Sequence, residues 1–533
     1  MKIVCENLEK FGRNLLPRIL TQVCRDVNHP DYGAFDRNWW HYKIRDFASI
    51  ILQQGGYALS CASQLSENKA KEKYLLNLAK ASCLFWSKRA KKYGAFEEYY
   101  PWEQGYPPVA FSSLAVAKMV GAGVVTAEEV YAGLSVAAKQ LLMNFEDKAT
   151  NQQVAGMAAL CIIQKVAPNL VNAIELKAIC DKTLSYQHEE GWYMEYGGPD
   201  LGYLSVTMDC LWDIFDATCD VRFKDSAAKA LNFIDIFVAM PQCGAGMFNA
   251  RNTDYIVPYG IARFLGDQEY DEKARRILNR LFCDLDNPDH FLYAVDDRYF
   301  CHYVGHSIFR AIVILRAVSM KDCQKTVEPV INHFFKGTGH LLNSDTISGC
   351  AVLVAGKKGG VVSLDFNGRR CIDYGWVFSS DGKDWVSHWW GDFWKINCVE
   401  NGISVCGYMV PHRENVSTPV KHLVLRGLSL VLGRRIIGML KDKLIFKKCK
   451  NKIIPFERHI RLLPDRVELI DKISIISREG LKRAPRSSKR HVASADSYHN
   501  EDFCLVDLGL KREESFSQNK GLLEIKTCYS CKE

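Results

Sequence analysis

The sequence predicts an α+β protein with more than one domain, in which an array of helical hairpins precedes an antiparallel β-sandwich. Apolar residues recur three and four positions apart from about residue 10 to 335, which is the spacing of a buried helix face. After Gly337 the pattern changes to short runs of β-type residues separated by turn residues. At 533 residues, the chain is long enough for more than one hydrophobic core.

The first region shows ten segments with helical periodicity, joined by loops rich in Gly, Pro and aromatic residues. Short loops between successive helices indicate antiparallel hairpins, so ten or more helices suggest either an incomplete (α/α) toroid or a solenoid. No repeat is regular enough to define a consensus. The predicted helices span residues 44–59, 70–88, 112–120, 127–144, 155–166, 170–186, 224–238, 256–265, 271–285 and 306–318.

The second region contains many short strands. The dipeptide Asn367-Gly368 predicts a tight hairpin, because both residues accept a positive φ. Many short strands with turn signals favour an antiparallel sandwich, and the boundary is placed so that the domains span 1–338 and 339–533. The predicted strands span residues 350–355, 361–366, 369–374, 423–432, 435–440, 443–446, 457–463 and 467–476.

Composition and charge exclude several classes of protein. The hydrophobic content of 48% is ordinary, and the net charge of +8 is too mild to indicate nucleic acid but suits an acidic substrate such as a polyuronate. No apolar run reaches the length of a membrane span, and no apolar signal core follows Met1, so we expect a cytoplasmic protein. The 20 cysteines are scattered, which favours a reducing compartment. We expect no cofactor and leave open a structural divalent metal in the sandwich.

A glycine-rich stretch at 196–207 is the strongest single candidate for a site. Its three glycines and one proline form a turn that leads into a predicted helix beginning near Ser205. Tyr203 and Asp200 lie in this turn, where a hydroxyl and a carboxylate can reach a substrate. A tight turn whose tyrosines only pack on neighbouring helices is the structural alternative.

Four further loop clusters combine aromatic and polar residues, at 36–43, 97–106, 249–259 and 296–310. Trp and Tyr side chains stack on sugar rings, while Arg and Asn bind carboxylates and hydroxyls. Four such clusters at helix ends predict one shared cleft. The candidate substrate-binding residues are Trp40, Trp102, Tyr106, Arg251, Asn252, Tyr255, Tyr259 and Arg310.

His302 and His306 are four positions apart, which would place both on one face of a helix. A metal pair is conceivable at that spacing, but there is no Glu between them as in a zinc-protease helix and Gly305 weakens the helix. We therefore expect no metal, and we expect one histidine to act as a general base with Arg310 as its charged neighbour. A structural histidine bonded to a carbonyl is the alternative for each.

Several stretches resemble the heparinase II/III-like polysaccharide lyases and their alginate-lyase relatives, in which a helical toroid precedes an antiparallel sandwich. The segment 151–160 is similar to the place where these lyases have Asn-His or Asn-Asn before a small-residue helix, and Tyr203 follows Asn151 by 52 positions, near the spacing of the family's catalytic tyrosine. The stretches 356–375 and 456–473 resemble strands of the family's sandwich.

The resemblance implies a β-elimination at a uronate in an acidic polysaccharide. For this reaction Asn151, Gln152 or Arg251 would neutralise the substrate carboxylate, and Tyr203 would serve as acid or as both acid and base in turn. In place of the family's histidines, His302 or His306 would serve as base. The resemblance also associates the paired histidines with proteins of bacterial surface-polysaccharide biosynthesis. The oligomeric state stays open.

The chain departs from the family at two places. Gln152 stands where the family often has histidine, and Gly359-Gly360-Val361 stands where the family often has a His-x-His element. Two other functions therefore stay open. One is an inverting glycoside hydrolase that uses two carboxylates among the set Glu97, Glu98, Glu103, Asp200 and Asp209. The other is a non-catalytic glycan-binding or assembly protein.

Overall fold

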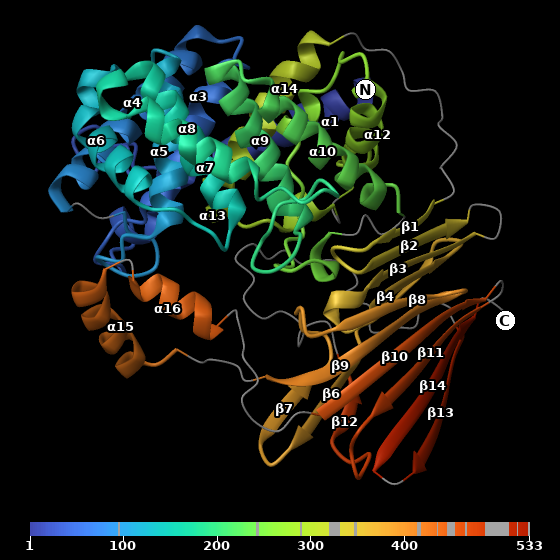
Figure 1. Cartoon of the computed structure of the whole chain (residues 1–533). Coiled ribbons are helices and arrows are strands. Elements are labelled where there is room, and N and C mark those ends of the chain that lie inside the picture. Colours follow the sequence, from blue (N-terminus) through green and yellow to red (C-terminus); the bar gives the residue numbers. More distant parts are fainter. Residues whose placement is uncertain are drawn as a thin grey trace.

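The structure of the chain is a computed structural model. It describes residues 1–93, 96–240, 245–287, 290–318, 331–345, 349–412, 417–433, 435–444, 454–463, 466–484, 511–519 and 521–530. A helical region and a region of antiparallel sheet lie against each other, with a separate helical hairpin beside them (Figure 1). None of the described helices is long and apolar enough to cross a membrane.

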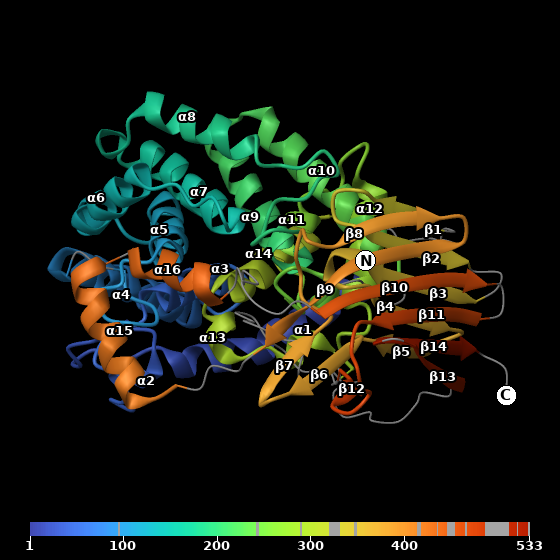
Figure 2. The same ribbon diagram turned by 60° about the horizontal axis from the view of Figure 1, so that its bottom comes forward.

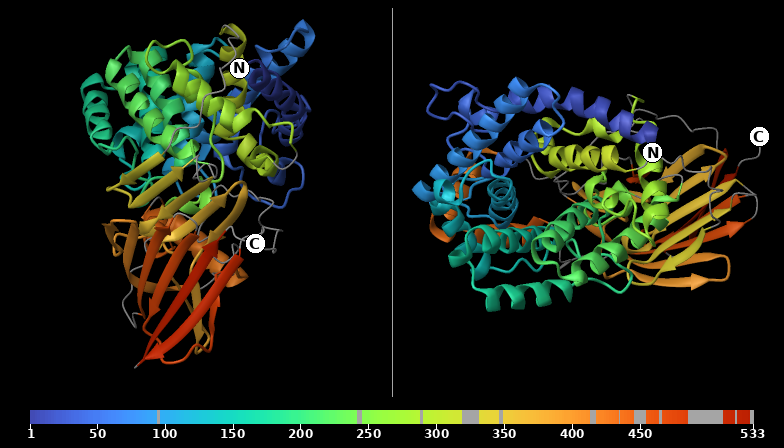
Figure 3. Two further views of the ribbon diagram at one scale, coloured as in Figure 1. Left: turned by 90° about the vertical axis from the view of Figure 1, so that its right-hand side faces the viewer. Right: turned by 90° about the horizontal axis from the view of Figure 1, so that it is seen from above.

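The helical region is a two-layered ring. Helices α3, α5, α7, α9, α11 and α14 contact one another in this order, and α14 returns to α3. The view from above in Figure 3 shows the ring, with the other helices outside it. The helices are α1 (Lys2–Gln22), α2 (Arg37–Trp40), α3 (Gln54–Ser63), α4 (Lys69–Tyr93), α5 (Tyr106–Gly121), α6 (Ala127–Met143), α7 (Thr150–Val166), α8 (Ala173–Leu184), α9 (Leu201–Thr218), α10 (Val221–Val238), α11 (Tyr259–Ala262), α12 (Asp271–Phe282), α13 (Asp297–Phe300) and α14 (Tyr303–Ala317).

The sheet region consists of two antiparallel sheets. The first has the strand order β1-β2-β3-β4-β5, and the second has the order β12-β6-β7-β9-β10-β11-β14-β13 with β8 paired to β9. The strands are β1 (Ile331–Phe335), β2 (His340–Asp345), β3 (Cys350–Ala355), β4 (Val361–Phe366), β5 (Arg369–Asp373), β6 (Trp376–Ser380), β7 (Lys383–Val386), β8 (Lys395–Val399), β9 (Gly402–His412), β10 (Ile454–Leu463), β11 (Arg466–Ile473), β12 (Leu481–Arg483), β13 (Lys511–Asn519) and β14 (Leu522–Ser530).

The first sheet is buried on both faces, which joins the two regions into one body. Successive residues of a strand point to opposite faces. In β3, Leu353 packs into the core of the helical region, while Val352 and Val354 pack into the core shared with the second sheet. All six residues of β4 are buried for the same reason. The predicted toroid followed by an antiparallel sandwich is confirmed.

Strand positions near the predicted boundary and turn agree in part with the structure. Asn367 and Gly368 connect β4 to β5 with φ values of 52° and 82°, as the hairpin signal predicted. Strand β1 begins at Ile331, before the predicted boundary at 338, and Ile331 and Phe335 pack into the helical core.

The strands predicted at 423–432 and 435–440 are wrong. These residues form two helices, α15 (Pro419–Leu432) and α16 (Arg435–Leu444), which are inserted between β9 and β10. The prediction at 443–446 falls on the end of α16 and on residues outside the described ranges. Pro419 stands in the first helical turn, and the Thr418 side chain accepts a hydrogen bond from the Lys421 N–H, so the helix start is capped in the usual way.

A buried ion-pair network stabilises the sandwich. The fully buried Arg458 of β10 donates from Nε and Nη2 to the two carboxylate oxygens of Asp471, at 2.6 and 2.7 Å. Its Nη1 donates to Asp373 and to the Gly360 carbonyl, at 3.1 and 3.0 Å. Arg458 thus ties the sandwich core to the turn that follows Lys358.

Replacing Arg458 by methionine (Arg458→Met) is expected to lower the free energy of unfolding by about 3–5 kcal/mol, because Asp373 and Asp471 would stay buried without their common partner. Urea denaturation followed by fluorescence measures the change. Arg461→Met in the same strand is the control, since Arg461 is exposed and its loss should change the stability by less than about 0.5 kcal/mol. Equal effects of the two substitutions would contradict the role given to Arg458.

Candidate active site

The candidate site lies where the inner helices of the ring begin. Inner and outer helices alternate along the chain, so the inner helices run in the same direction and their N-termini meet at one end of the ring. This end faces the sheet region (Figure 1). The aromatic and polar loop clusters of the sequence all precede inner helices, and this explains how they come to share one end of the molecule. Helix N-termini also carry partial positive charge, which favours an anionic ligand.

Two of these loops are joined by backbone pairing, which places Asn151 beside the glycine-rich turn. Ala149 forms a β-bridge with Glu195, and the Asn151 N–H donates to Glu195 Oε1 at 2.6 Å. Gln152 Nε2 donates to the Tyr196 hydroxyl at 3.3 Å. The Asn151 side chain is 2% exposed, and its Oδ1 has no hydrogen-bond partner among the residues that the structure describes. A buried amide with an unused atom is a candidate ligand group.

Tyr203 and Arg251 interact electrostatically beside this turn. Asp200 caps helix α9 by accepting from the Tyr203 N–H at 3.0 Å, which fixes Tyr203 in the first helical turn. The guanidinium of Arg251 lies 4.4 Å from the centre of the Tyr196 ring. Burial alone would lower the pKa of Arg251. Tyr196, Tyr203 and the nearby carboxylates raise it by more, so the pKa of Arg251 is raised overall and the side chain stays charged.

Four other tyrosines lie around Tyr203. The Tyr255 and Tyr303 hydroxyls are hydrogen-bonded at 2.7 Å, and the Tyr255 and Tyr299 rings are 6.1 Å apart. The pKa values of Tyr255, Tyr299 and Tyr303 are raised well above the ordinary value by burial and by their electrostatic interaction with Tyr203. For Tyr99 the pKa is also raised, first by Glu98 and then by burial. These side chains remain neutral hydroxyls that can donate hydrogen bonds to a bound sugar.

The two histidines occupy different surroundings. His302 lies against Tyr299, with ring centres 5.1 Å apart, and its Nε2 is buried without a partner among the described residues. His306 lies 5.0 Å from the Tyr57 ring, beside the cluster formed by Lys118, Asp213 and Arg310. Burial lowers the pKa of both imidazoles well below the ordinary value, and Arg298 lowers that of His302 further. Both are therefore neutral at neutral pH, and both are weak bases.

A lysine from the sheet region reaches into the site. Lys358 lies in the short 3₁₀ helix after β3 and is fully buried. Its Nζ donates to the Asn249 carbonyl at 2.6 Å and to Asn252 Oδ1. Because Oδ1 faces the lysine, the Asn252 Nδ2 points elsewhere, and it is buried without a partner within the described ranges. Lys358 therefore fixes which side of the Asn252 amide is offered to a ligand.

The Lys358 side chain changes its protonation state near neutral pH. Burial, with a smaller effect from Arg251, lowers the pKa of the ammonium group to about 7, although Asp200 and Asp254 oppose the shift. A folded-state pKa below the unfolded value means that the unfolded chain binds more protons between these two pH values.

A tryptophan of the sheet region packs on the glycine-rich turn. Trp390 Nε1 donates to the Gly197 carbonyl at 3.0 Å. A Cβ atom at Gly198 would lie 2.1 Å from the Trp390 indole, so only glycine fits beneath the ring. The turn that leads to Tyr203 is thus held by the sheet region, as is the loop that carries Arg251.

The other candidate residues have their described contacts elsewhere in the ring. Tyr259 and Arg310 stack at 3.3 Å within the ring, where Arg310 is paired with Asp213. Tyr106 donates to Gln153 Oε1 at 3.0 Å, and Trp40 donates to the Gln22 carbonyl at 2.8 Å. Trp102 is 40% exposed in the loop before α5.

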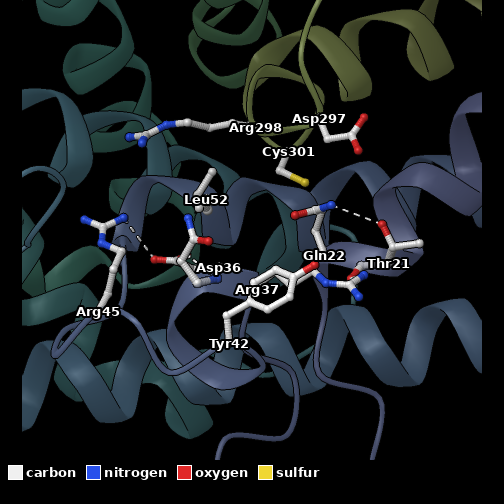
Figure 4. Close-up of a pocket in the computed structure, with 11 residues that line it drawn as sticks. Thr21, Gln22, Asp36, Arg37, Tyr42, Arg45, Leu52, Asp297, Arg298 and Cys301 are labelled. Carbon is white, nitrogen blue, oxygen red and sulfur yellow. Dashed lines mark hydrogen bonds and ion pairs between the residues drawn. The ribbon is translucent and has the colours of Figure 1, made fainter.

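A polar cavity of about 380 Å³ adjoins the site on the side of Arg298 (Figure 4). Arg298 lies in its wall and also pairs with Glu98 at 3.1 Å, and its guanidinium is 5.3 Å from the Tyr99 ring centre. The cavity brings the cluster at 36–43 next to the cluster at 296–310. Its lining consists of Thr21, Gln22, Asp36, Arg37, Asn38, Tyr42, Arg45, Leu52, Asp297, Arg298 and Cys301.

Each candidate carboxylate of a hydrolase accepts a hydrogen bond from a backbone N–H or pairs with an arginine. Glu103 accepts N–H bonds from Glu98, Tyr99 and Tyr100, and Glu98 pairs with Arg298. The other candidates are similarly engaged: Glu97 with the Trp102 N–H, Asp200 with the Tyr203 N–H and Asp209 with the Gly260 N–H. In the part of the chain that the structure describes, no group of three or more His, Cys, Asp and Glu residues is placed to hold a metal.

Sequence reasoning missed Lys358, Trp390, Tyr299, Tyr303 and Arg298. The last three stand inside the predicted cluster at 296–310, so the aromatic content of that loop was their signal. No sequence signal pointed to Lys358 or Trp390, because the residues that they bond lie more than 100 positions away in the sequence.

Comparison with known proteins supports the fold. No protein-family model matches the chain, and no curated protein matches it. Among solved structures, it is similar to the chondroitin AC lyase of Streptomyces coelicolor A3 in complex with chondroitin sulphate. The TM-score is 0.56 at 9% identity, over 99% of this chain and 77% of that chain. It is also similar to a Paenibacillus xanthan lyase, with a TM-score of 0.51 at 10% identity.

The second comparison covers 89% of this chain and 46% of the xanthan lyase, so the chain spans less than half of that protein. Both similar proteins are polysaccharide lyases by name. The resemblance in fold that the sequence indicated is therefore confirmed: the chain has the toroid-and-sheet fold of polysaccharide lyases.

Lys358→Met should remove a pH dependence of stability. In the wild-type protein the cost of burying the charge is fully present below about pH 7 and disappears as the pH rises toward about 10.5. The free energy of unfolding of the wild type, relative to the variant, should therefore rise by up to about 1.4 kcal/mol per pH unit in this window. Chemical denaturation of both proteins at several pH values measures the difference.

Lys357→Met is the matched control for this experiment. Lys357 is the neighbouring residue, but its Nζ pairs with the exposed Asp392 at 2.8 Å. The difference between wild type and this variant should stay flat between pH 7 and pH 10. A flat difference for Lys358→Met as well would show that the buried lysine does not titrate in this range.

Proposed function

We propose that the protein is a polysaccharide lyase that cleaves a uronate-containing polysaccharide by β-elimination at the Tyr203 site. What supports this most is the electrostatic interaction of Tyr203 with the Arg251 cation, together with two buried amides, Asn151 and Asn252, that each keep a polar atom without a partner among the described residues. These groups come from two inner-helix N-termini and one loop that the sheet region holds in place. The chondroitin and xanthan lyases of similar fold act on polysaccharides, which agrees with this proposal.

Neutralising the substrate carboxylate is the first requirement of the reaction. The C5 proton of a uronate is weakly acidic, and it becomes removable only when the negative charge developing on the C6 carboxylate is stabilised. Asn252 offers an Nδ2 that no described residue uses, and the Asn151 amide can present either its oxygen or its NH₂ group after a half-turn rotation. Arg251 adds a full positive charge near the same turn.

Proton transfer is the second requirement. Tyr203 accepts the C5 proton, the C5–H electrons form the C4–C5 double bond, and the C4–O4 bond breaks. The departing O4 then takes a proton, which Tyr203 returns if the elimination is syn. The charge of Arg251 favours the phenolate that this step needs. His302 lies against Tyr299 of the tyrosine cluster, and its neutral imidazole can hydrogen-bond the sugar or assist as base.

The inverting hydrolase is less well supported. Such an enzyme needs two carboxyl groups that are free to act on a water molecule and on the leaving oxygen. Each candidate carboxylate of this chain accepts a backbone N–H bond or pairs with an arginine. The non-catalytic glycan-binding alternative makes a different prediction, namely binding of an acidic polysaccharide without cleavage.

Tyr203→Phe tests the proposal. The wild-type protein, incubated with acidic polysaccharides such as chondroitin and polyuronates, should generate the ultraviolet absorbance of an unsaturated uronate. The variant should lower kcat by about 10²- to 10⁴-fold, because it loses the group that transfers the proton, with a smaller effect on substrate binding. Thermal melting of the variant verifies that it is folded.

Tyr193→Phe is the control for the loss of a buried tyrosine hydroxyl. Tyr193 is 1% exposed and bonds Ser226 at 2.8 Å, in contact with the outer helix α10. It should retain wild-type kcat. If Tyr203→Phe retains it too, Tyr203 does not transfer the proton; if the wild type binds glycans and never produces the absorbance, the non-catalytic alternative holds.

A further inference from the structure

The hairpin of α15 and α16 exposes an apolar stripe. Its described outward side chains follow the helical spacing i, i+3, i+4, i+8 and i+11, so they lie on one face of α15. Their exposed fractions range from 40% to 81%. Seven of the 23 exposed large hydrophobic side chains of the described chain fall within residues 420–439. The members of the stripe are Val420, Leu423, Val424, Leu428 and Val431, with Leu430 and Met439 beside it.

The hairpin has few contacts with the rest of the protein. Arg426 pairs with Asp46 at 2.7 and 3.0 Å, and the His422 ring lies 6.1 Å from Tyr100. Helix α16 covers a cavity of about 360 Å³ together with residues of α5, of α6 and of the loop between α6 and α7. All these contacts use the inner side of the hairpin, and Figure 2 shows it on the helical region, away from the sandwich strands that precede and follow it.

The inserted segment also carries the excess positive charge of the chain. Residues 413–453, which connect β9 to β10, contain eleven Lys and Arg residues against two acidic ones, a net charge of +9. The whole chain has a net charge of +8, so the remaining residues together carry −1. Helix α15 contains the basic residues Lys421 and Arg426 and no acidic residue; Arg426 pairs with Asp46 on the inner side of the hairpin.

We propose that this hairpin binds the surface of a membrane that contains anionic lipids, with α15 lying in the plane of the interface. A basic amphipathic helix with exposed Leu and Val on one face has the pattern of interfacial helices: the apolar face enters the boundary of the acyl chains, and the basic side chains contact anionic headgroups. The charge segregated in this segment complements such a surface.

An acidic polysaccharide explains the same positive charge less well. It would contact the basic residues, but it would leave the apolar stripe exposed to water, because sugars of a charged polymer offer little apolar surface. The stripe is therefore the feature that favours lipid. The hairpin also contacts the loop that carries Tyr99, so membrane binding would keep the candidate site close to the surface, while the proposal itself does not depend on the lyase activity.

Vesicle flotation of the full-length protein tests the proposal. The vesicles consist of phosphatidylcholine alone, or of phosphatidylcholine with about 30% phosphatidylglycerol. The wild type should float with the anionic vesicles, bind the neutral ones at least about tenfold more weakly, and lose affinity as salt is added. The double variant Leu423→Gln, Val431→Gln should lower the partition coefficient for anionic vesicles by about tenfold or more.

The double variant Ile174→Gln, Val221→Gln is the matched control, because Ile174 on α8 and Val221 on α10 are 82% and 61% exposed and their replacement also removes two exposed aliphatic side chains. It should float like the wild type, and all three proteins should melt at the same temperature. The proposal is overturned if the wild type does not bind anionic vesicles or if the double variant binds them unchanged. It is also overturned if the hairpin binds an acidic polysaccharide but not anionic vesicles, or if the double variant changes self-association and leaves vesicle binding unchanged.

Discussion

One buried cation in the sandwich connects the stability of the protein to the geometry of its candidate site. Arg458 is held by Asp373 and Asp471, and its remaining donor fixes the Gly360 carbonyl. That carbonyl belongs to the turn after Lys358, and Lys358 in turn holds the loop of Asn249 and Asn252. Arg251 lies in the same loop and interacts electrostatically with Tyr203. Charged hydrogen bonds therefore connect the sandwich core, through the turn at Lys358 and Gly360, to the loop that carries Arg251, and removing a buried partner at any point leaves a buried polar group unsatisfied.

This arrangement explains why two regions are needed for one site. The ring supplies the tyrosines, amides and helix N-termini, but its loops are long and rich in glycine, so they need external support to hold a fixed geometry. The first sheet provides that support because it is buried on both faces, against helices on one side and the second sheet on the other. Trp390 bonds the glycine-rich turn that precedes Tyr203, and Lys358 bonds the loop that carries Arg251, so the sheet region contacts both segments.

The sequence was sufficient for the periodic parts of the fold and for the loops that carry the site. Helical spacing identified the ring, and Asn367-Gly368 identified a hairpin with the two positive φ values that it needs. Residues 423–432 were assigned to a strand because Leu and Val dominate them, although Val420, Leu423, Val424 and Val431 have helical spacing and Thr418-Pro419 is a helix start. Lys358 could not be identified from the sequence, because its role depends on its hydrogen bonds to Asn249 and Asn252, which lie more than 100 residues away. Tyr203 was singled out from composition, and its role in catalysis stays a prediction.

The central claim is that the polysaccharide is cleaved by elimination and not by hydrolysis, and the fate of oxygen from water distinguishes the two. Cleavage of an acidic polysaccharide in water enriched in heavy oxygen, followed by mass spectrometry of the fragments, measures it directly. Elimination adds no water across the broken bond, so the new ends should carry no heavy oxygen and one of them should contain the C4–C5 double bond. Heavy oxygen at the new reducing end, without a double bond, would contradict the account and assign the site to hydrolysis.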